Sequence, residues 1–372
     1  MNYEYFLTLF CIIFFLSIAL TKVNILLAEK KNFKSIANER SSHFLPVANG
    51  GGLSFLLITV LGLFFVKDFQ GFSVENSNYF LIASFFIGII GYIDDLKDIS
   101  PLPRFLLQVL ASTFVILSFS RFPHINFFDF IISNKIMVSA FGIIFLVWLT
   151  NLYNFMDGID GLATLQGIFI LFSYFFIIFV AGDDLLEINQ EKLFFLHSII
   201  ILMSALFGFL IFNFPNSSIF MGDVGSSFLG FFLASMGIYA ASNNWIYFWT
   251  FTIIWSIFLV DATVTLLSRI WRRDKWYDAH RTHAYQKINQ IYMRKIKNKY
   301  DNESDIRTVS HKLVCLLYSG VNLFWVLPLS LLSIKYPQFG FMIAFICFVP
   351  IVIGSLYVEA GKQINTVARN EK

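Results

Sequence analysis

The sequence predicts an all-α, polytopic integral membrane helix bundle. Of its 372 residues, 57% are hydrophobic and only 14% are charged, whereas soluble domains carry about 25% charged residues. The apolar residues fall into long runs, and the Lys and Arg residues gather in alternate segments between those runs. Together these observations indicate a chain that uses lipid as its solvent, and they exclude an ordinary soluble domain.

Eleven apolar runs are interpreted as membrane-spanning helices, which need about 20 residues each. In lipid the backbone polar groups must be hydrogen-bonded within the segment, so helices are expected. The first run lacks a basic start and a small-residue cleavage site, and we therefore expect a membrane helix rather than a removable signal. The predicted spans are residues 5–27, 50–66, 79–93, 104–120, 136–153, 161–181, 193–213, 224–241, 245–268, 312–333 and 337–357.

The positions of Lys and Arg predict which side of the membrane each connecting segment faces. The chain has 27 Lys and Arg residues. Lys22 lies inside the first span, and five others lie in the segments on the same side of the membrane as the N-terminus. The other 21 lie in or beside residues 28–49, 94–103, 154–160, 214–223, 269–311 and the C-terminal tail. Because positive charge marks cytoplasmic segments, we expect the N-terminus outside and the C-terminus in the cytoplasm, with residues 1–372 forming one transmembrane domain.

Three stretches rich in carboxylates and glycines interrupt the apolar pattern, all at predicted cytoplasmic ends of spans. They are Gly91–Pro101 with Asp94, Asp95 and Lys97, Asn151–Gly161 with Asn154, Asp157 and Asp160, and Phe220–Ser226 with Asp223. Magnesium prefers carboxylate and amide oxygens, and one or two protein ligands suffice because it keeps several waters. Such acids are also found as solvated residues at helix ends, but three clusters on one side of a chain so poor in charge favour a functional site.

Spacing within the clusters suggests how the acids divide the work. Asn154, Asp157 and Asp160 are three residues apart, so on a helical turn they share a face. Asp94 and Asp95 are adjacent and point in different directions, which suits separate roles such as metal contact and proton acceptance. Lys97 fits contact with a phosphate, and it fits equally well a simple topology signal.

The segment 269–311 is a long, basic cytoplasmic connection, and it begins with Arg269, Arg272 and Arg273. Basic residues beside a membrane attract anionic headgroups. His280 and His283 flank Arg281, a pattern that suits a phosphorylated ligand; zinc is the alternative, although further Cys or His ligands are missing nearby. Two other features stay open. Asp261, inside the ninth span, is either a structural partner or faces the bundle interior, and Pro46–Gly52 approaches a ligand or acts as a hinge.

At these residues the chain resembles the polyprenyl-phosphate N-acetylhexosamine-1-phosphate transferases (the MraY/WecA superfamily, glycosyltransferase family 4). Gly91–Pro101 resembles the family's Asp-Asp motif, and Asn151–Ala163 its Asn-Phe-Met-Asp-Gly-Ile-Asp-Gly-Leu-Ala motif. Residues 212–230 resemble the Phe-Met-Gly-Asp-x-Gly-Ser motif, and 280–286 the histidine loop. Arg104 and Gln108 match its Arg-Phe-x-x-Gln pattern. The motifs run in family order over residues 46–286.

The resemblance implies that a UDP-N-acetylhexosamine gives its sugar-1-phosphate to undecaprenyl phosphate and releases UMP, with Mg²⁺ as cofactor and Mn²⁺ as a substitute. It implies a bacterial inner membrane, a cytoplasmic active site, the lipid bilayer as a partner and no nucleic acid, and it leaves a homodimer open. Carried over position by position, the metal residues are Asn154 and Asp223. The catalytic residues are Asp94, Asp95, Asp157 and Asp160. The substrate-binding residues are Lys97, Asn151, His280, Arg281 and His283.

Departures from the family pattern narrow the expectation. The peptidoglycan enzyme of the family carries three histidines in the loop and a Leu-Thr variant of the central motif, whereas this chain has two histidines and Phe155-Met156. Both features resemble the initiators of O-antigen or capsule more than the peptidoglycan enzyme, which stays the alternative. Val47-Ala48-Asn49 stands where many members have Thr-Pro-Arg. A transporter would place its acids near mid-membrane, and a scaffold would leave the acids unexplained. Direct in-line attack is preferred over an aspartyl-phosphate route.

Overall fold

The computed structural model describes residues 3–35, 46–72, 77–97, 99–119, 121–127, 130–132, 134–180, 189–274 and 281–362. Its helices are α1 (Tyr3–Lys30), α2 (Gly52–Gln70), α3 (Ser77–Lys97), α4 (Pro101–Ser118), α5 (Lys135–Phe155), α6 (Leu162–Val180), α7 (Gln190–Asn213), α8 (Gly222–Ser242), α9 (Phe248–Ile254), α10 (Ser256–Trp271), α11 (Ala284–Ile296), α12 (Glu303–Val321), α13 (Leu327–Lys335) and α14 (Gly340–Tyr357). Short strands are β1 (Lys34–Ser35), β2 (Val47–Ala48), β3 (Ile125–Phe127) and β4 (Phe130–Ile132).

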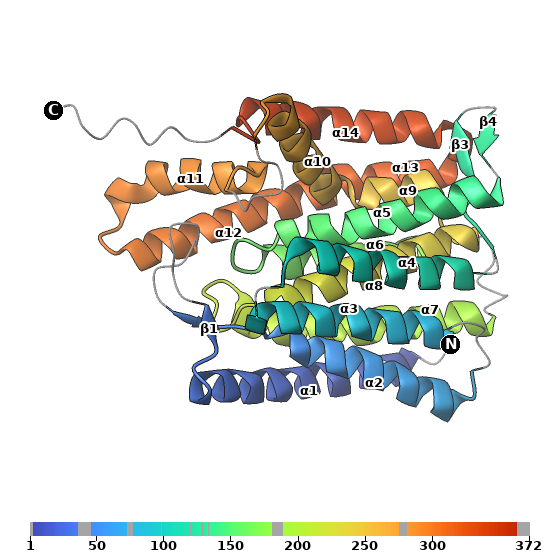
Figure 1. The fold of residues 1–372 in the computed structure, drawn as a ribbon, viewed down its shortest axis with the longest axis horizontal. Helices are drawn as coiled ribbons and strands as arrows, with labels where there is room; N and C mark the ends of the chain where they lie inside the picture. The colour runs from blue at the N-terminus through green and yellow to red at the C-terminus, as the bar shows by residue number, and fades with distance from the viewer. Residues whose placement is uncertain are drawn as a thin grey trace.

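The helices lie side by side in one bundle, with α1 and α2 at one margin and α13 and α14 at the other (Figure 1). In the described part of the chain, ten helical segments are long and apolar enough to cross a membrane, and the bent pair α9–α10 makes an eleventh if it counts as one span. The predicted multi-pass helix bundle of about eleven spans is therefore confirmed. The second and third spans, expected to be short, are full-length helices in the structure.

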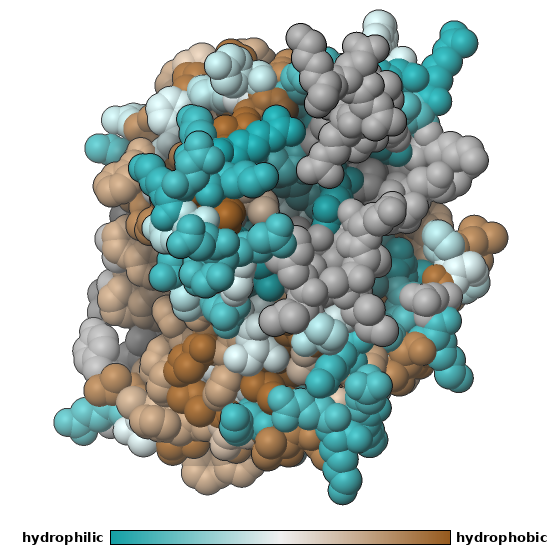
Figure 2. Space-filling view, turned by 90° about the vertical axis from the view of Figure 1, so that its left-hand side faces the viewer, coloured by the Kyte–Doolittle hydropathy of each residue, from teal (hydrophilic) through white to brown (hydrophobic). Residues whose placement is uncertain are grey.

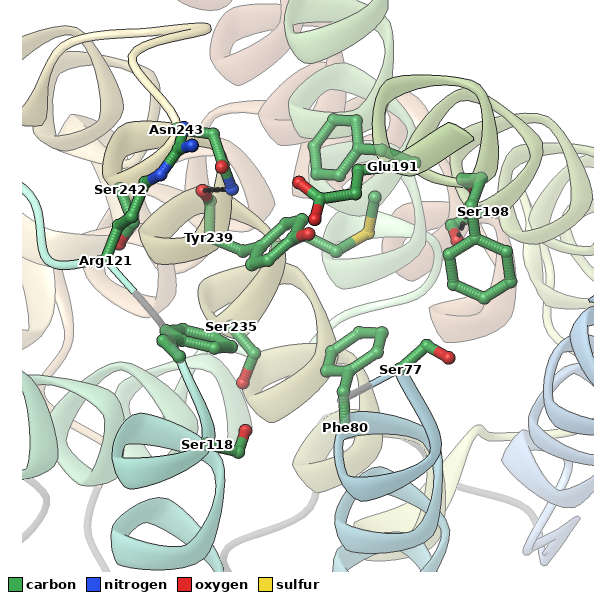
Figure 3. A pocket seen from close by; sticks show the side chains of 14 residues that line it. Ser77, Phe80, Ser118, Arg121, Glu191, Ser198, Ser235, Tyr239, Ser242 and Asn243 are labelled. Atoms are coloured by element: carbon green, nitrogen blue, oxygen red, sulfur yellow. Dashed lines mark hydrogen bonds between the residues drawn. The ribbon is translucent and has the colours of Figure 1, made fainter. Parts of the chain in front are cut away.

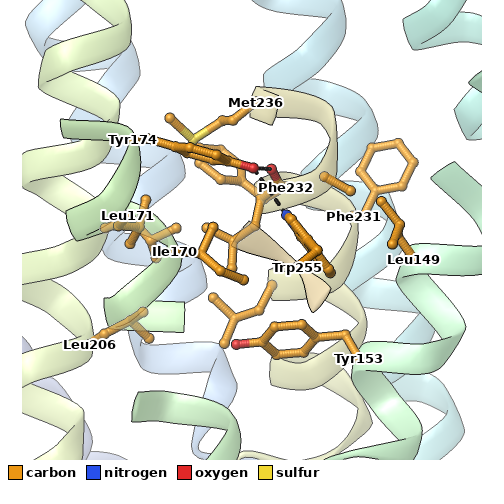
Figure 4. Packing of buried hydrophobic residues seen from close by; sticks show 14 of the residues in the cluster. Leu149, Tyr153, Ile170, Leu171, Tyr174, Leu206, Phe231, Phe232, Met236 and Trp255 are labelled. Carbon is orange, nitrogen blue, oxygen red and sulfur yellow. Dashed lines mark hydrogen bonds between the residues drawn. The ribbon is translucent and has the colours of Figure 1, made fainter. Parts of the chain in front are cut away.

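The ninth span is broken, and the expected single helix over 245–268 is therefore wrong. α9 and α10 meet at an angle of 76°. Trp255 at the break is fully buried, and its indole nitrogen donates to the Tyr174 hydroxyl at 3.0 Å. Figure 4 shows this pair within a core of large apolar side chains, including Leu149, Ile170 and Phe232. A break is tolerated at membrane depth where protein rather than lipid surrounds the backbone.

The predicted cytoplasmic connection 269–311 contains a helical hairpin. It includes α11 and the first turns of α12, which then continues through a π-helical turn at Asn322–Val326 into α13. Helix α11 is amphipathic, and its sequence is mostly polar, so a search for apolar runs passes over it. The hairpin lies at one end of the bundle, on the left in Figure 1.

Two small hairpins add the few strands of the described chain. β1 pairs with β2, and β3 pairs with β4, both antiparallel. β2 also meets the segment before α8, because Phe220 N–H donates to Ala48 O at 2.9 Å and Gly51 N–H donates to Phe220 O at 2.8 Å. The Pro46–Gly52 stretch is thus tied down beside the N-terminus of α8 rather than serving as a free hinge.

Glycines allow α3 and α8 to pack with their backbones almost in contact. A Cβ atom on Gly91 of α3 would collide with the backbone carbonyl of Asp223, and one on Gly52 of α2 would collide with Gly225. Small residues at helix interfaces permit this close approach in membrane proteins, where dispersion contacts replace the hydrophobic effect. The contact brings the end of α3 with Asp94 and Asp95 directly against the start of α8.

The close contact predicts that Gly91→Ala destabilises the protein, because overpacking a tight interface costs about 1–3 kcal/mol. Gly320→Ala is a matched helical control, since a Cβ there meets nothing within 4 Å, and it should gain up to about 1 kcal/mol from helix propensity. Thermal unfolding of the detergent-solubilised variants measures both effects. Equal melting temperatures for the two variants would contradict the packing described here.

Candidate functional site

Asp95 joins the end of α3 to the beginning of α8. Its carboxylate accepts hydrogen bonds from the backbone N–H groups of Asp223 at 3.0 Å and Val224 at 3.1 Å. The Asn49 side-chain amide donates to it at 3.1 Å. Gly222, with φ of +71°, makes the turn that aims these amides at Asp95. Asp95 therefore acts as the N-terminal cap of α8, where a negative charge is stabilised by the unpaired amides and the helix dipole.

Asp94 points the other way, as its adjacency to Asp95 led us to expect. It is buried, accepts a hydrogen bond from Ile99 N–H at 2.8 Å and forms an ion pair with Arg104. The same Arg104 nitrogen lies 3.4 Å from Asp223 Oδ2. Arg104 thus links the first acid cluster to the third.

Asn154 and Asp223 lie in direct contact. The Asn154 side-chain amide donates to Asp223 Oδ1 at 2.8 Å and to the Ser226 hydroxyl at 2.9 Å. Asn151, nearly one turn earlier on α5, donates to Gln108 Oε1 at 2.6 Å. The structure therefore brings together the two predicted metal residues, and it places Asn151 against α4.

Asp95, Asn154 and Asp223 line a cavity at one end of the bundle, whereas Asp94 and Asn151 are not among its described lining residues. The described residues lining it include members of all three clusters and of the hairpin: Asn49, Asp95, Asn154, Asp157, Asp160, Asp223, Gln286, Arg307 and His311. Figure 2 looks onto this end of the molecule, where hydrophilic side chains gather and hydrophobic ones lie along the margins. The predicted convergence of the acid clusters at one end of the bundle is present in the structure.

The carboxyl group of Asp157 has a strongly raised pKa. Burial raises its pKa to about 8, and the negative charges of Asp223, Asp95 and Asp160 add to that effect. Among the described residues, its side chain has no hydrogen-bond donor. A carboxyl group in such surroundings keeps its proton unless a nearby cation stabilises the negative charge.

The donor atoms at this end suit a hard cation. Asp223, Asn154 and Asp157 supply carboxylate and amide oxygens, the atoms that magnesium prefers. Across the described ranges, no three His, Cys, Asp or Glu side chains are grouped in a way that would hold a metal. Magnesium needs only one or two protein ligands, because water or substrate oxygens complete its shell.

The histidine loop is partly described. His280 lies outside the described residues, and Arg281 is half-buried. His283 is buried at the start of α11, with its Nδ1 3.4 Å from Asp261 Oδ1. The described residues that line the cavity do not include Arg281, His283 or the exposed Lys97. Gln286 is the described residue of this loop that reaches the cavity.

Asp261 fixes the position of that loop. Its carboxylate accepts hydrogen bonds from the backbone N–H groups of Ala284 at 2.8 Å and Tyr285 at 3.0 Å, and from the Tyr318 hydroxyl at 3.2 Å. Asp261 therefore caps α11 from within α10, which answers the question left open by the sequence in favour of a structural role.

Two residues of α12 that the sequence analysis missed close the cavity on another side. Arg307 donates to both carboxylate oxygens of Asp160, at 2.7 and 2.8 Å, and His311 Nδ1 lies 3.0 Å from Asp160 Oδ2. Burial acts to raise the pKa of Asp160, but the hydrogen bond and charge of His311, with Arg307 and Ser217, outweigh it and lower the pKa. The available signal was the spacing of four between Arg307 and His311, which places them on one helix face.

A second cavity lies at the opposite end of α3 and α8, and Figure 3 shows it from close by. Aromatic rings, serine hydroxyls, Arg121, Glu191 and Tyr239 line it. It lacks the acid clusters and is remote from them along α3 and α8, so the cavity at the hairpin end is the candidate functional site.

Comparison with known proteins agrees with the geometry. A family model described as glycosyl transferase family 4 matches residues 77–241. The phospho-N-acetylmuramoyl-pentapeptide-transferase of Streptococcus pneumoniae serotype 2 is 29% identical over 227 residues, which cover 58% of this chain. The protein of the same name from Streptococcus gordonii is 28% identical over 228 residues, again 58% of this chain. In both cases the match spans 65% of the relative's length. Over residues 77–241 the chain is therefore similar to glycosyl transferase family 4.

Proposed function

We propose that this protein transfers an N-acetylhexosamine-1-phosphate from a UDP-sugar to undecaprenyl phosphate and releases UMP. The observation that supports the proposal is the acid-lined cavity at one end of a membrane bundle, where three motifs distant in sequence meet. A water-soluble donor and a membrane-held acceptor can meet only at such an interface. In the proposed topology, the cavity faces the cytoplasm of a bacterium, at its inner membrane, and the product starts a lipid-linked surface glycan such as O-antigen.

Magnesium is the proposed cofactor, with Asn154 and Asp223 as its protein ligands and Mn²⁺ as a substitute. The mutual repulsion of Asp157, Asp223 and Asp95 supports a cation here. Of these three residues, Arg104 pairs with Asp223, so a further positive charge would be stabilised by the cluster. When bound, magnesium neutralises the diphosphate of the donor.

The proposed reaction is a direct in-line displacement. An oxygen of the lipid phosphate forms a bond to the sugar-side phosphorus of the donor, while the bond from that phosphorus to the bridging oxygen breaks and UMP leaves with the electron pair. Asp94 and Asp95 already accept hydrogen bonds from the protein. We therefore assign acceptance of a proton from the lipid phosphate to Asp157, whose carboxylate faces the cavity without such donors among the described residues.

The remaining predicted residues have supporting positions in this proposal. Asp95 holds the N-terminus of α8, and with it Asp223, in place. Gln286 contacts the donor, and Asp261 with His283 holds the loop that carries it. Lys97, His280 and Arg281 are proposed to attract the anionic substrates from the surrounding surface.

A second candidate is the transfer of phospho-N-acetylmuramoyl-pentapeptide, the activity that the names of the matched relatives state. The two-histidine loop and Phe155-Met156 favour the first candidate. Both share the same cavity and the same leaving group, so only the donor distinguishes them.

Purified protein with magnesium, undecaprenyl phosphate and a panel of UDP-sugars, including UDP-N-acetylmuramoyl-pentapeptide, should release UMP with a UDP-N-acetylhexosamine. The measurement is UMP by chromatography together with the lipid product by mass spectrometry. Turnover of the pentapeptide donor alone would establish the second candidate instead, and no release from any donor by folded protein would refute both.

Asp223→Asn should lower the turnover number by about 100- to 1000-fold, because it removes a carboxylate that neutralises the cation and its phosphates. Asp305→Asn, which changes an exposed carboxylate of α12, is the matched control and should leave turnover unchanged. Membrane insertion and gel-filtration behaviour should match the wild type in both variants. Wild-type turnover by Asp223→Asn would remove Asp223 from the metal site.

The raised pKa of Asp157 predicts a pH-dependent stabilisation by magnesium. In metal-free protein the folded state holds a proton on Asp157 that the unfolded state has lost, so the Asp157 contribution to stability falls as pH rises from about 4 to about 8. Added magnesium should therefore raise the melting temperature more at pH 8 than at pH 6. Asp157→Asn should remove most of this difference. A magnesium effect equal at both pH values in the wild type would contradict the proposed cation site.

A further inference from the structure

One face of α12 contacts residues 156–161, the turn that connects α5 to α6. Arg307, His311 and Cys315 are spaced by four residues, and all three contact Asp160. Arg307 and His311 bind its carboxylate, and the Cys315 thiol donates to its backbone carbonyl at 3.4 Å. The Ser217 hydroxyl, from the segment before α8, donates to the same carboxylate. Asp160 is thus the point where three separate parts of the chain are joined.

The turn itself has few backbone hydrogen bonds. At its start, Met156 N–H donates to Leu152 O and Tyr153 O, both at 3.2 Å, and Asp157 N–H donates to Asn154 O at 3.2 Å. At its end, Leu162 N–H donates to Ile159 O at 3.3 Å and Leu165 N–H donates to Gly161 O at 2.9 Å. Gly161, with φ of +78°, ends the turn before α6 begins. These bonds lie at the two ends of the turn, and the contacts of Asp160 with α12 hold the part between them.

The buried contacts of Asp160 with Arg307 and His311 are poorly suited to a role in stability alone. Asp160, Arg307 and His311 are all buried, and Arg307 Nε and His311 Nε2 have no hydrogen-bond partner among the described residues. Buried ion pairs of this kind are often no more stable than well-packed apolar side chains, because desolvation cancels the attraction.

We propose that Asp160, Arg307 and His311 are positioning residues, which hold the turn 156–161 so that Asp157 faces the cavity. This assignment rests on the proposed function and revises the catalytic role first expected for Asp160. All three residues line the cavity beside Asp157. Both oxygens of the Asp160 carboxylate are already bound by Ser217, Arg307 and His311. In this proposal, Asp160 therefore acts on the substrate only by placing its neighbours.

We call the contacts of Asp160 with Arg307 and His311 the clamp. Hydrogen–deuterium exchange of the detergent-solubilised full chain tests whether the clamp orders the turn 156–161, and it needs no substrate. Arg307→Gln should speed amide exchange in residues 156–161 by about tenfold, because the turn opens more often once its anchor is lost. Lys312→Gln, an exposed change on the same helix, should leave it unchanged. Unchanged exchange in folded Arg307→Gln, or an equal increase throughout the protein, would overturn the proposal.

Two further variants guard against simple misfolding. Arg307→Lys keeps the charge and should show exchange between that of wild type and Arg307→Gln. The double variant Asp160→Asn with Arg307→Gln removes both members of the Asp160–Arg307 ion pair, so it should fold at least as well as either single variant while the turn still exchanges fast. Slow, wild-type exchange in the double variant would overturn the proposal.

A double-mutant cycle on turnover separates positioning from direct chemistry. Asp160→Asn and Arg307→Gln should each lower kcat by about 100-fold, the scale of a misplaced catalytic group, with KM changed by less than about twofold. Because both act through the same turn, the double variant should lose about the same 100-fold. Losses that multiply would show an independent role for Asp160 and overturn the proposal. Absence of UMP release by the wild type would count against the proposed function only, and the exchange data would still decide the clamp.

Discussion

The architecture of the site depends on one contact, the Asp95 carboxylate against the first amides of α8. A helix N-terminus offers unpaired N–H groups and a partial positive charge, and Asp95 satisfies both. The contact is possible because Gly91 lets the two backbones meet. The placement of Asp223 follows from where α8 begins, and Asn154 of α5 and Arg104 of α4 contact it there.

Hydropathy was sufficient to predict where the spans lie, although not the bend in the ninth, because each membrane helix must be apolar over its own length. The gathering of the acid clusters at one end of the bundle was also predictable, since alternate spans return the chain to the same side of the membrane. The opposite directions of Asp94 and Asp95 followed from their adjacency. These are properties of local sequence, and they need no knowledge of which helices are neighbours.

Partners brought together by tertiary packing could not be predicted. Arg307 and His311 look like ordinary polar residues at the start of a span, and only the folded chain places them on Asp160, about 150 positions earlier. The bend at Trp255 has neither Pro nor Gly to announce it. His283 was expected to face the substrate, yet its placement beside Asp261 depends on where α10 ends up.

The placement of Asp261 has a consequence for how the chain is assembled. Asp261 lies in the bent membrane segment, and a carboxylate in that setting is costly until it finds partners. Three of its donors come from Ala284, Tyr285 and Tyr318, which are synthesised after it. We therefore expect this corner of the bundle to become stable only once the α11–α12 hairpin and the start of the following span have emerged, so that insertion of α10 and docking of this hairpin form one coupled step.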